Sequence, residues 1–115
     1  MFANRYEIRF SGAGGQGLIL AGIIMGEAAA IFDGKEAVQS QSYGPEARGG
    51  ASKSEVVISD APIDFPKATA VDALLALTQE ACDKYSRDLK EGGVLLVDSD
   101  MVQRMPQGNF SVVGF

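Results

Sequence analysis

The sequence predicts an α/β fold: a Rossmann-like, three-layer domain with a mostly parallel sheet. β-prone and helical segments alternate along the chain, and the runs at Leu74–Leu77 and Val94–Val97 are continuously apolar, as in strands buried on both faces. The first strand also leads through a glycine-rich turn into a helix. At 115 residues and 46% hydrophobic content, residues 1–115 predict one domain with one modest core.

The first half predicts three strands around one helix: a strand at Tyr6–Phe10, a helix at Gln16–Ile31, and strands at Ala37–Gln41 and Lys53–Ser59. The helix is too short to span a bilayer, so it predicts a buried element. Its apolar residues lie on almost every side, so we expect something to cover it. Its small residues favour packing against its own sheet, with a contact to another backbone as the alternative: Gly22, Gly26, Ala29 and Ala30.

The second half predicts a strand at Asp72–Leu77 and a helix at Gln79–Leu89, with Thr78 as its N-cap. Gly92-Gly93 is expected to end that helix before a strand at Val94–Asp98. A last strand, "FSVVGF", reaches residue 115 with no helix after it. Because a doubly wound sheet needs a crossover helix there, we expect the domain to be incomplete at its C-terminus, by roughly a third.

Composition excludes several classes of protein. Ten Lys and Arg against fifteen Asp and Glu give a net charge of -5, which disfavours a nucleic-acid or anionic-membrane binder. One cysteine, Cys82, and no histidine leave no internal disulfide, no zinc site and no cluster bound by this chain alone. "MFANRYEIRF" lacks the apolar core of a signal peptide. We therefore expect a cytoplasmic protein without a metal site or membrane span.

The first glycine loop has the spacing of a dinucleotide-binding turn, with Gly12, Gly14 and Gly17 in the G-x-G-x-x-G pattern. Such a site needs a carboxylate about 20 residues later, at the end of the second strand. Here that strand reads "AVQSQ", and Asp33 lies in the turn before it, so NAD binding is disfavoured. The backbone N–H groups would still suit an anion such as phosphate, unless the glycines only allow close packing.

The second glycine loop, "SYGPEARGGAS", joins two predicted strands and contains Arg48 followed by two glycines. In an α/β sheet such a loop can lie at the strand ends where ligands collect. Arg48 would then present a guanidinium fork to a phosphate or carboxylate. The alternative is a tight turn with a solvated arginine.

Four segments in this order resemble the gamma subunit, or gamma-type catalytic domain, of the 2-oxoacid:ferredoxin oxidoreductases, which includes the pyruvate and ketoisovalerate enzymes. They are "GAGGQG" at Gly12–Gly17, "QSYGPEARGG" at Gln41–Gly50, "SEVVIS" at Ser54–Ser59 and "ALLALTQEA" at Ala73–Ala81. The amino-acid sequence of the second segment is most similar to that of the 2-oxoglutarate branch of the family. The resemblance covers nearly the whole chain.

The resemblance implies a complex that oxidatively decarboxylates a 2-oxoacid to its acyl-coenzyme A. Thiamine diphosphate, magnesium and iron–sulfur clusters would sit on partner subunits: alpha, beta and a ferredoxin-like delta, with ferredoxin or another acceptor taking the electrons. This chain would support assembly and approach coenzyme A, without a catalytic residue of its own. The residues carried over as cofactor-binding are Gly12, Gly14, Gly15, Gln16, Gly17, Tyr43, Gly44, Glu46, Arg48 and Gly49. The alternatives are a purely structural subunit and an independent nucleotide-binding Rossmann-like module.

Overall fold

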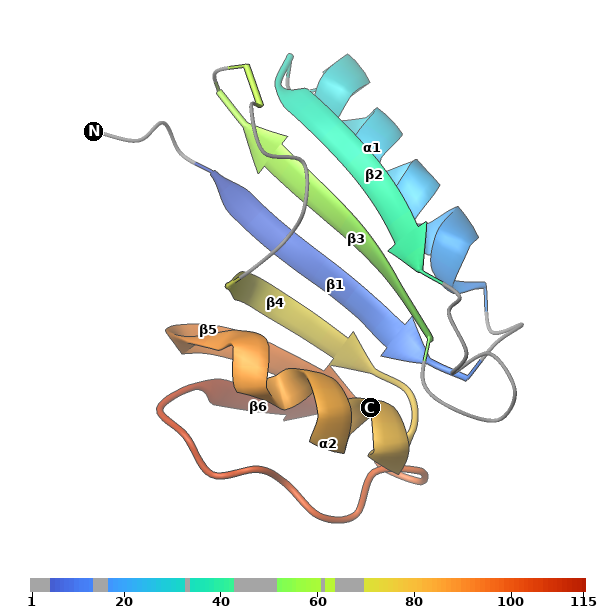
Figure 1. The fold of residues 1–115 in the computed structure, drawn as a ribbon, viewed down its shortest axis with the longest axis vertical. Helices are drawn as coiled ribbons and strands as arrows, with labels where there is room; N and C mark the ends of the chain where they lie inside the picture. The colour runs from blue at the N-terminus through green and yellow to red at the C-terminus, as the bar shows by residue number, and fades with distance from the viewer. Residues whose placement is uncertain (1–4, 14–16, 33, 43–51, 61, 64–69) are drawn as a thin grey trace.

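The computed structural model describes residues 5–13, 17–32, 34–42, 52–60, 62–63 and 70–115. They form a six-stranded sheet in the order β2-β3-β1-β4-β5-β6, with one helix on each face (Figure 1). In chain order the elements are β1 (Tyr6–Gly12), α1 (Leu18–Phe32), β2 (Glu36–Ser42), β3 (Ser52–Ser59), β4 (Val71–Ala76), α2 (Gln79–Tyr85), a 3₁₀ turn (Ser86–Asp88), β5 (Leu89–Val97) and β6 (Ser111–Gly114).

The predicted α/β fold is confirmed, with one strand running against the rest. β1, β4, β5 and β6 pair in parallel, whereas β3 is antiparallel to both of its neighbours, β1 and β2. Because β2 therefore runs in the same direction as β1, five of the six strands end at the same edge of the sheet. The first strand of the chain, β1, lies in the interior of the sheet between β3 and β4.

Two apolar clusters cover the two faces of the sheet. Alternating side chains separate them, because successive residues of a strand point to opposite faces. Val56 packs with Phe10 and Leu18 under α1. Its neighbour Val57 belongs to the larger cluster under α2, together with buried residues from β4, β5, α2 and the segment after β5: Val71, Leu74, Ala76, Ala81, Cys82, Tyr85, Leu95, Val97 and Val102.

Three of the four small residues named in α1 face the sheet, as predicted: Gly22, Gly26 and Ala29. A Cβ built on Gly22 would stand 2.3 Å from the Oγ of Ser54, and one on Gly26 would lie 4.0 Å from Val56. Ala29 is buried, although Ala30 is exposed. The missing side chain at Gly22 thus lets α1 approach β3 closely, which is the packing against its own sheet that the sequence favours. Within the described residues, neither helix has the length and apolarity that crossing a membrane requires.

The predicted helix at Gln79–Leu89 is too long, and the role given to Gly92-Gly93 is wrong. Thr78 does cap the helix, because its Oγ1 accepts a hydrogen bond from the Ala81 N–H at 3.1 Å. The α-helix, however, ends at Tyr85, and β5 already begins at Leu89. The predicted start of that strand at Val94 is therefore also wrong.

A bulge explains the two glycines. Val71 pairs with Leu89 and Ala73 with Val94, so β5 carries extra residues opposite a short piece of β4. Gly92 has φ +82°, a conformation that favours glycine, and a Cβ on Gly93 would meet the Asp72 carbonyl oxygen at 2.9 Å. The glycines therefore permit a bulge inside the strand instead of ending a helix.

Candidate functional site: the glycine-loop edge of the sheet

The described ends of the two glycine loops meet at one edge of the sheet. Gly12, the last residue of β1, pairs with Ser52, the first residue of β3. Ser42, the last residue of β2, pairs with Lys53 on the other side of β3. The first loop starts at the end of β1. The second loop starts at the end of β2 and ends at the start of β3. These three loop ends therefore lie on adjacent strands, at the carboxyl edge of the parallel strands. This is the edge at which α/β sheets bind ligands. We call it the glycine-loop edge.

Two of the ten predicted site residues lie in the described part of the chain. Gly12 is buried at the end of β1. Gly17 has φ +77°, and its carbonyl oxygen accepts a hydrogen bond from the Ala21 N–H at 2.9 Å, which starts α1. A residue with a side chain would be strained in this backbone conformation, which explains why the last position of the motif is a glycine. The other eight lie outside the described residues: Gly14, Gly15, Gln16, Tyr43, Gly44, Glu46, Arg48 and Gly49.

The rest of the described edge is held together by its own hydrogen bonds. The Ser11 carbonyl oxygen accepts from the Leu77 N–H at 3.0 Å, and the Ser11 hydroxyl donates to the Leu75 carbonyl at 2.9 Å. Asp98, just after β5, accepts from the Asp100 N–H at 3.0 Å. Among the described residues no cluster of acids and cysteines could hold a metal ion.

The sequence reasoning missed a charged cluster on the α2 side of the sheet. Arg9, 1% exposed, donates to Glu55 and to Asp88, each at 2.6 Å, and its guanidinium lies 5.3 Å from the centre of the Tyr85 ring. Lys53 forms a further ion pair with Glu55 at 3.2 Å. These contacts join β1, β3, α2 and the 3₁₀ turn.

A local signal for this cluster exists in the sequence. Charged residues alternate with apolar or small ones in β1 and in β3, at Glu7 and Arg9 and at Lys53 and Glu55. Such alternation places each pair of charges on one face of its strand. The register then sets Arg9 directly opposite Glu55, and this pairing of distant segments is what the sequence does not reveal.

Cys82 is buried in the cluster under α2. Burial raises the pKa of its thiol, and the negative charge of Asp83 raises that pKa further. Since the thiolate is the nucleophilic form, the residue is a poor nucleophile at neutral pH. The helix around it, α2, buries Ala81, Cys82 and Tyr85.

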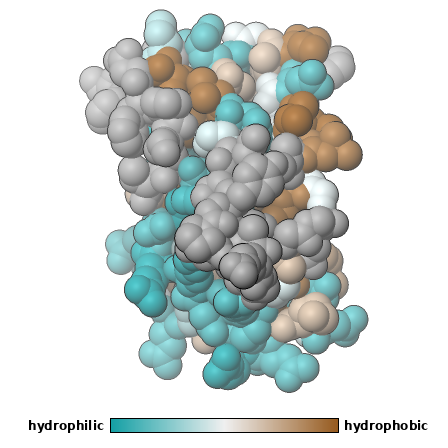
Figure 2. Space-filling view, turned by 45° about the vertical axis from the view of Figure 1, so that its right-hand side comes forward, coloured by the Kyte–Doolittle hydropathy of each residue, from teal (hydrophilic) through white to brown (hydrophobic). Residues whose placement is uncertain are grey.

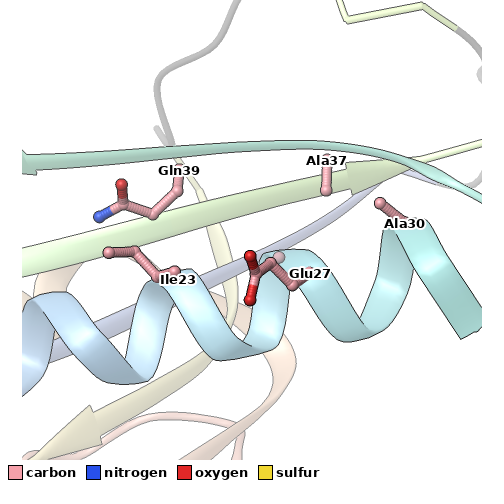
Figure 3. Close-up of a pocket in the computed structure, with 6 residues that line it drawn as sticks. Ile23, Glu27, Ala30, Ala37 and Gln39 are labelled. Atoms are coloured by element: carbon pink, nitrogen blue, oxygen red, sulfur yellow. The ribbon is translucent and has the colours of Figure 1, made fainter.

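A shallow hollow of about 260 Å³ lies between α1 and the edge strand β2 (Figure 3). It is lined by Ile23, Gly26, Glu27, Ala30, Ala37 and Gln39. Its lining is mostly apolar, and the Gln39 amide already donates to the Ser54 hydroxyl at 3.1 Å. None of its residues belongs to the glycine loops. The hollow is smaller than most small-molecule sites and is separate from the glycine-loop edge in sequence.

The comparisons with known proteins agree with the resemblance drawn from sequence. The chain is 69% identical over 105 residues to the 2-oxoglutarate synthase subunit KorC of Methanocaldococcus jannaschii, covering 90% of this chain and 56% of that protein. It superposes with a TM-score of 0.89 on the crystal structure of a keto/oxoacid ferredoxin oxidoreductase gamma subunit from Geobacter sulfurreducens. That structure is 75% identical, and the match covers 98% of this chain and 61% of the other.

A more distant structure shares the fold alone. It is the 2-oxoglutarate:ferredoxin oxidoreductase of Magnetococcus marinus, 22% identical, with a TM-score of 0.78 over 94% of this chain and 19% of that one. The chain spans about half the length of the curated relatives it matches. A family model described as "Pyruvate ferredoxin/flavodoxin oxidoreductase" matches residues 7–114. The fold, the two glycine loops and this match over nearly the whole sequence show that the chain belongs to the pyruvate ferredoxin/flavodoxin oxidoreductase family.

Proposed function

We propose that this chain is part of the gamma subunit of a thiamine-diphosphate-dependent oxidoreductase. The enzyme converts 2-oxoglutarate and coenzyme A to the acyl-coenzyme A and carbon dioxide, and ferredoxin or another acceptor takes the electrons. The observation that carries the proposal is the 69% identity to a subunit named for 2-oxoglutarate synthase. The gamma-subunit structure at 75% identity supports the assignment to that subunit.

The proposal assigns the redox chemistry to other subunits. A single cysteine, buried in the cluster under α2, cannot ligate an iron–sulfur cluster alone. Thiamine diphosphate and magnesium would be held by alpha and beta subunits, and the clusters by partners that include a ferredoxin-like delta subunit. Mixing this chain with those partners, 2-oxoglutarate and coenzyme A should give a complex that reduces ferredoxin as the oxoacid is oxidatively decarboxylated, and the chain by itself should not reduce it.

For the chain itself we propose that the two glycine loops approach the phosphates of coenzyme A. The meeting of their ends at one carboxyl edge supports this, because main-chain N–H groups at such an edge can receive an anion. Arg48 is the charged residue of the second loop in the sequence. Its truncation, Arg48→Ala, should weaken coenzyme A binding by roughly 10- to 150-fold, the loss of one charge-assisted contact of about 1.5–3 kcal/mol.

Steady-state kinetics of the assembled complex would test this role. We expect a raised KM for coenzyme A with little change in thiamine-dependent decarboxylation. Arg87→Ala, at an exposed arginine of the 3₁₀ turn, is the matched control and should leave both unchanged. An unchanged KM in a normally assembled Arg48→Ala complex would remove Arg48 from the coenzyme A site.

A structural role is the second candidate, and the outer side of α1 favours it. Five large apolar side chains of α1 are exposed: Leu20, Ile23, Ile24, Met25 and Ile31. Figure 2 shows hydrophobic atoms gathered in the upper part of the molecule, where α1 lies in Figure 1. Exposed apolar surface of this kind is typical of a protein contact.

This second role predicts a different pattern in the complex. Ile24→Lys should lower the yield of assembled enzyme and depress every partial reaction together, whereas the loop variant should assemble normally. Glu80→Lys, an exposed change on α2, serves as the control for added charge. Normal assembly of Ile24→Lys would exclude this face of α1 from the subunit contacts.

A further inference from the structure

The edge strand β2 is long, regular and open to pairing. It has seven residues, and all of them pair with β3 in one continuous antiparallel register. The outer edge of such a strand presents main-chain N–H and C=O groups to which another strand can bind. Proteins usually block an edge of this kind with a lysine, a proline or a bulge. Within Glu36–Ser42 there is none of the three, and Glu36 is the only charged residue.

The helix α1 gives this edge a partly apolar flank. It packs on β2 and β3, and the hollow described above lies between α1 and β2. Ile23 and Glu27 line it from the helix, and Ala37 and Gln39 line it from the strand (Figure 3). Ile23 is 41% exposed. We call the outer edge of β2 together with this hollow the β2-edge surface. It offers main-chain groups and a side-chain pocket, the two features by which a sheet edge binds an added strand.

A second copy of the chain has the charge pattern that this surface requires. Two β2 strands related by a twofold axis pair in antiparallel fashion. With the axis at Gln39, Glu36 of each copy lies opposite Ser42 of the other, and a shift of the register by two residues places it opposite Ser40. Like charges therefore do not face each other along the paired strands, where they would be destabilising.

The acidic residue of the hollow does not oppose this pairing either. A Cβ built on Gly22 would lie 3.2 Å from the Gln39 Cγ, so Gly22 is level with the proposed axis. Glu27 is five residues farther along α1, and the rise of a helix then separates the two Glu27 by roughly 15 Å along the paired helices. This distance exceeds the screening length of about 8 Å at physiological ionic strength.

The dimensions of the surface fit a weak but specific dimer. β2 is about 24 Å long, α1 is about 22 Å long, and a strand edge with a helix beside it is roughly 15 Å deep. A pair of copies would bury on the order of 1,000 Å² in total, close to the lower limit for a specific interface. The two α1 axes would lie roughly 10–14 Å apart, so side chains such as Ile23 would approach each other over the joined strands.

We propose that the β2-edge surface binds a second copy of this chain, by antiparallel pairing of β2 with β2 and contact between the two α1 helices. This inference does not depend on the reaction or on coenzyme A. It is also separate from the subunit contact proposed for the outer side of α1, because Ile24 lies about 100° around the helix from Ile23.

Sedimentation equilibrium of the 115-residue chain tests the proposal. From about 1 to 200 µM the chain should change from monomer to dimer, with a Kd on the order of 10 µM. Ile23→Lys places two charges in the interface and should raise this Kd by about tenfold or more. Ile24→Lys adds the same charge to the next residue of the helix and should leave the Kd within about twofold. Ser40→Lys blocks the strand edge and repeats the test should Ile23→Lys fail to fold.

Hydrogen exchange identifies the strand that pairs. At about ten times the Kd, roughly four fifths of the chains are dimeric, so the outward amides of β2 should exchange about fivefold more slowly than in dilute solution. Amides of β6, at the opposite edge, should not change. A monomer at all concentrations, equal weakening by Ile23→Lys and Ile24→Lys, or protection of β6 instead of β2 would overturn the proposal. Protection of β2 that appears only after alpha and beta subunits are added would also overturn it, because a partner subunit would then be the occupant.

Discussion

Alanine at two glycines of α1, Gly22 and Gly26, should change stability in opposite directions. In either case the new methyl group faces the sheet. At Gly22 it would stand 2.3 Å from the Ser54 Oγ and 3.2 Å from the Gln39 Cγ. At Gly26 its nearest neighbour would be Val56, at an ordinary 4.0 Å. The same substitution in the same helix thus meets a clash at one position and a normal contact at the other.

The expected magnitudes follow from these distances. Replacing glycine by alanine inside a helix gains about 0.5–1 kcal/mol, and Gly26→Ala should realise this gain. At Gly22 the gain is opposed by overpacking, which costs about 1–3 kcal/mol, and by disturbance of the Ser54–Gln39 hydrogen bond, worth about 1 kcal/mol. Gly22→Ala should therefore lower the free energy of unfolding by about 1–3 kcal/mol.

Urea unfolding of the 115-residue chain, followed by far-ultraviolet circular dichroism, measures both effects. The two variants should differ in midpoint by about 1 M urea or more, since m is about 1–3 kcal/mol/M for small proteins. Gly22→Ala combined with Ser54→Ala removes the opposing oxygen and should recover part of the loss. Equal stabilisation by both single substitutions would refute the close approach of α1 to β3.

Three further predictions concern α2 and the charged cluster beneath it. Arg9→Met leaves Glu55 buried without its main partner and should lower the free energy of unfolding by about 3–5 kcal/mol. Asp88→Asn, at a side chain that is 46% exposed, should lower it by at most about 1 kcal/mol. Similar losses of the two variants in urea unfolding would contradict this ranking. Thr78→Ala removes the N-cap of α2 and should cost about 1 kcal/mol by the same measurement, with no loss contradicting the cap. The pKa of the Cys82 thiol is higher in the folded chain than in the unfolded chain, so its contribution to stability is complete at neutral pH and is lost as the pH rises into the alkaline range. The urea midpoint should therefore decline at alkaline pH, and Cys82→Ala should weaken that decline.

The sequence predicted the elements whose signals are local. The apolar strands, α1 and the Thr78 cap were all predictable, because periodicity and capping act over a few residues. Features that depend on pairing between distant segments were not. No residue pattern in or beside β3 indicates that it pairs in an antiparallel direction. The two glycines of β5 resemble the end of a helix in the sequence, and only the contact with the Asp72 carbonyl, on the neighbouring strand, explains them.

The candidate site divides in the same way. The order of the segments was enough to place both glycine loops at strand ends, and the sheet register brings their described ends together. Most of the predicted binding residues lie outside the described part, so contact with coenzyme A stays a prediction. The cluster around Arg9 was missed because the partners of Arg9 come from three other elements, β3, α2 and the 3₁₀ turn.

The interior position of β1 also sets the order in which the protein can fold. β1 is made before its neighbours, and one of them, β4, contributes partners about 65 residues later, as in the contact between Glu7 and Asp72. Loop closure over such distances makes folding slow, so a nascent chain would hold an incompletely paired central strand until β4 emerges from the ribosome. Glu7 and Arg9 place two charges on one face of the incompletely paired β1, and these charges disfavour association with other chains until β4 pairs with it.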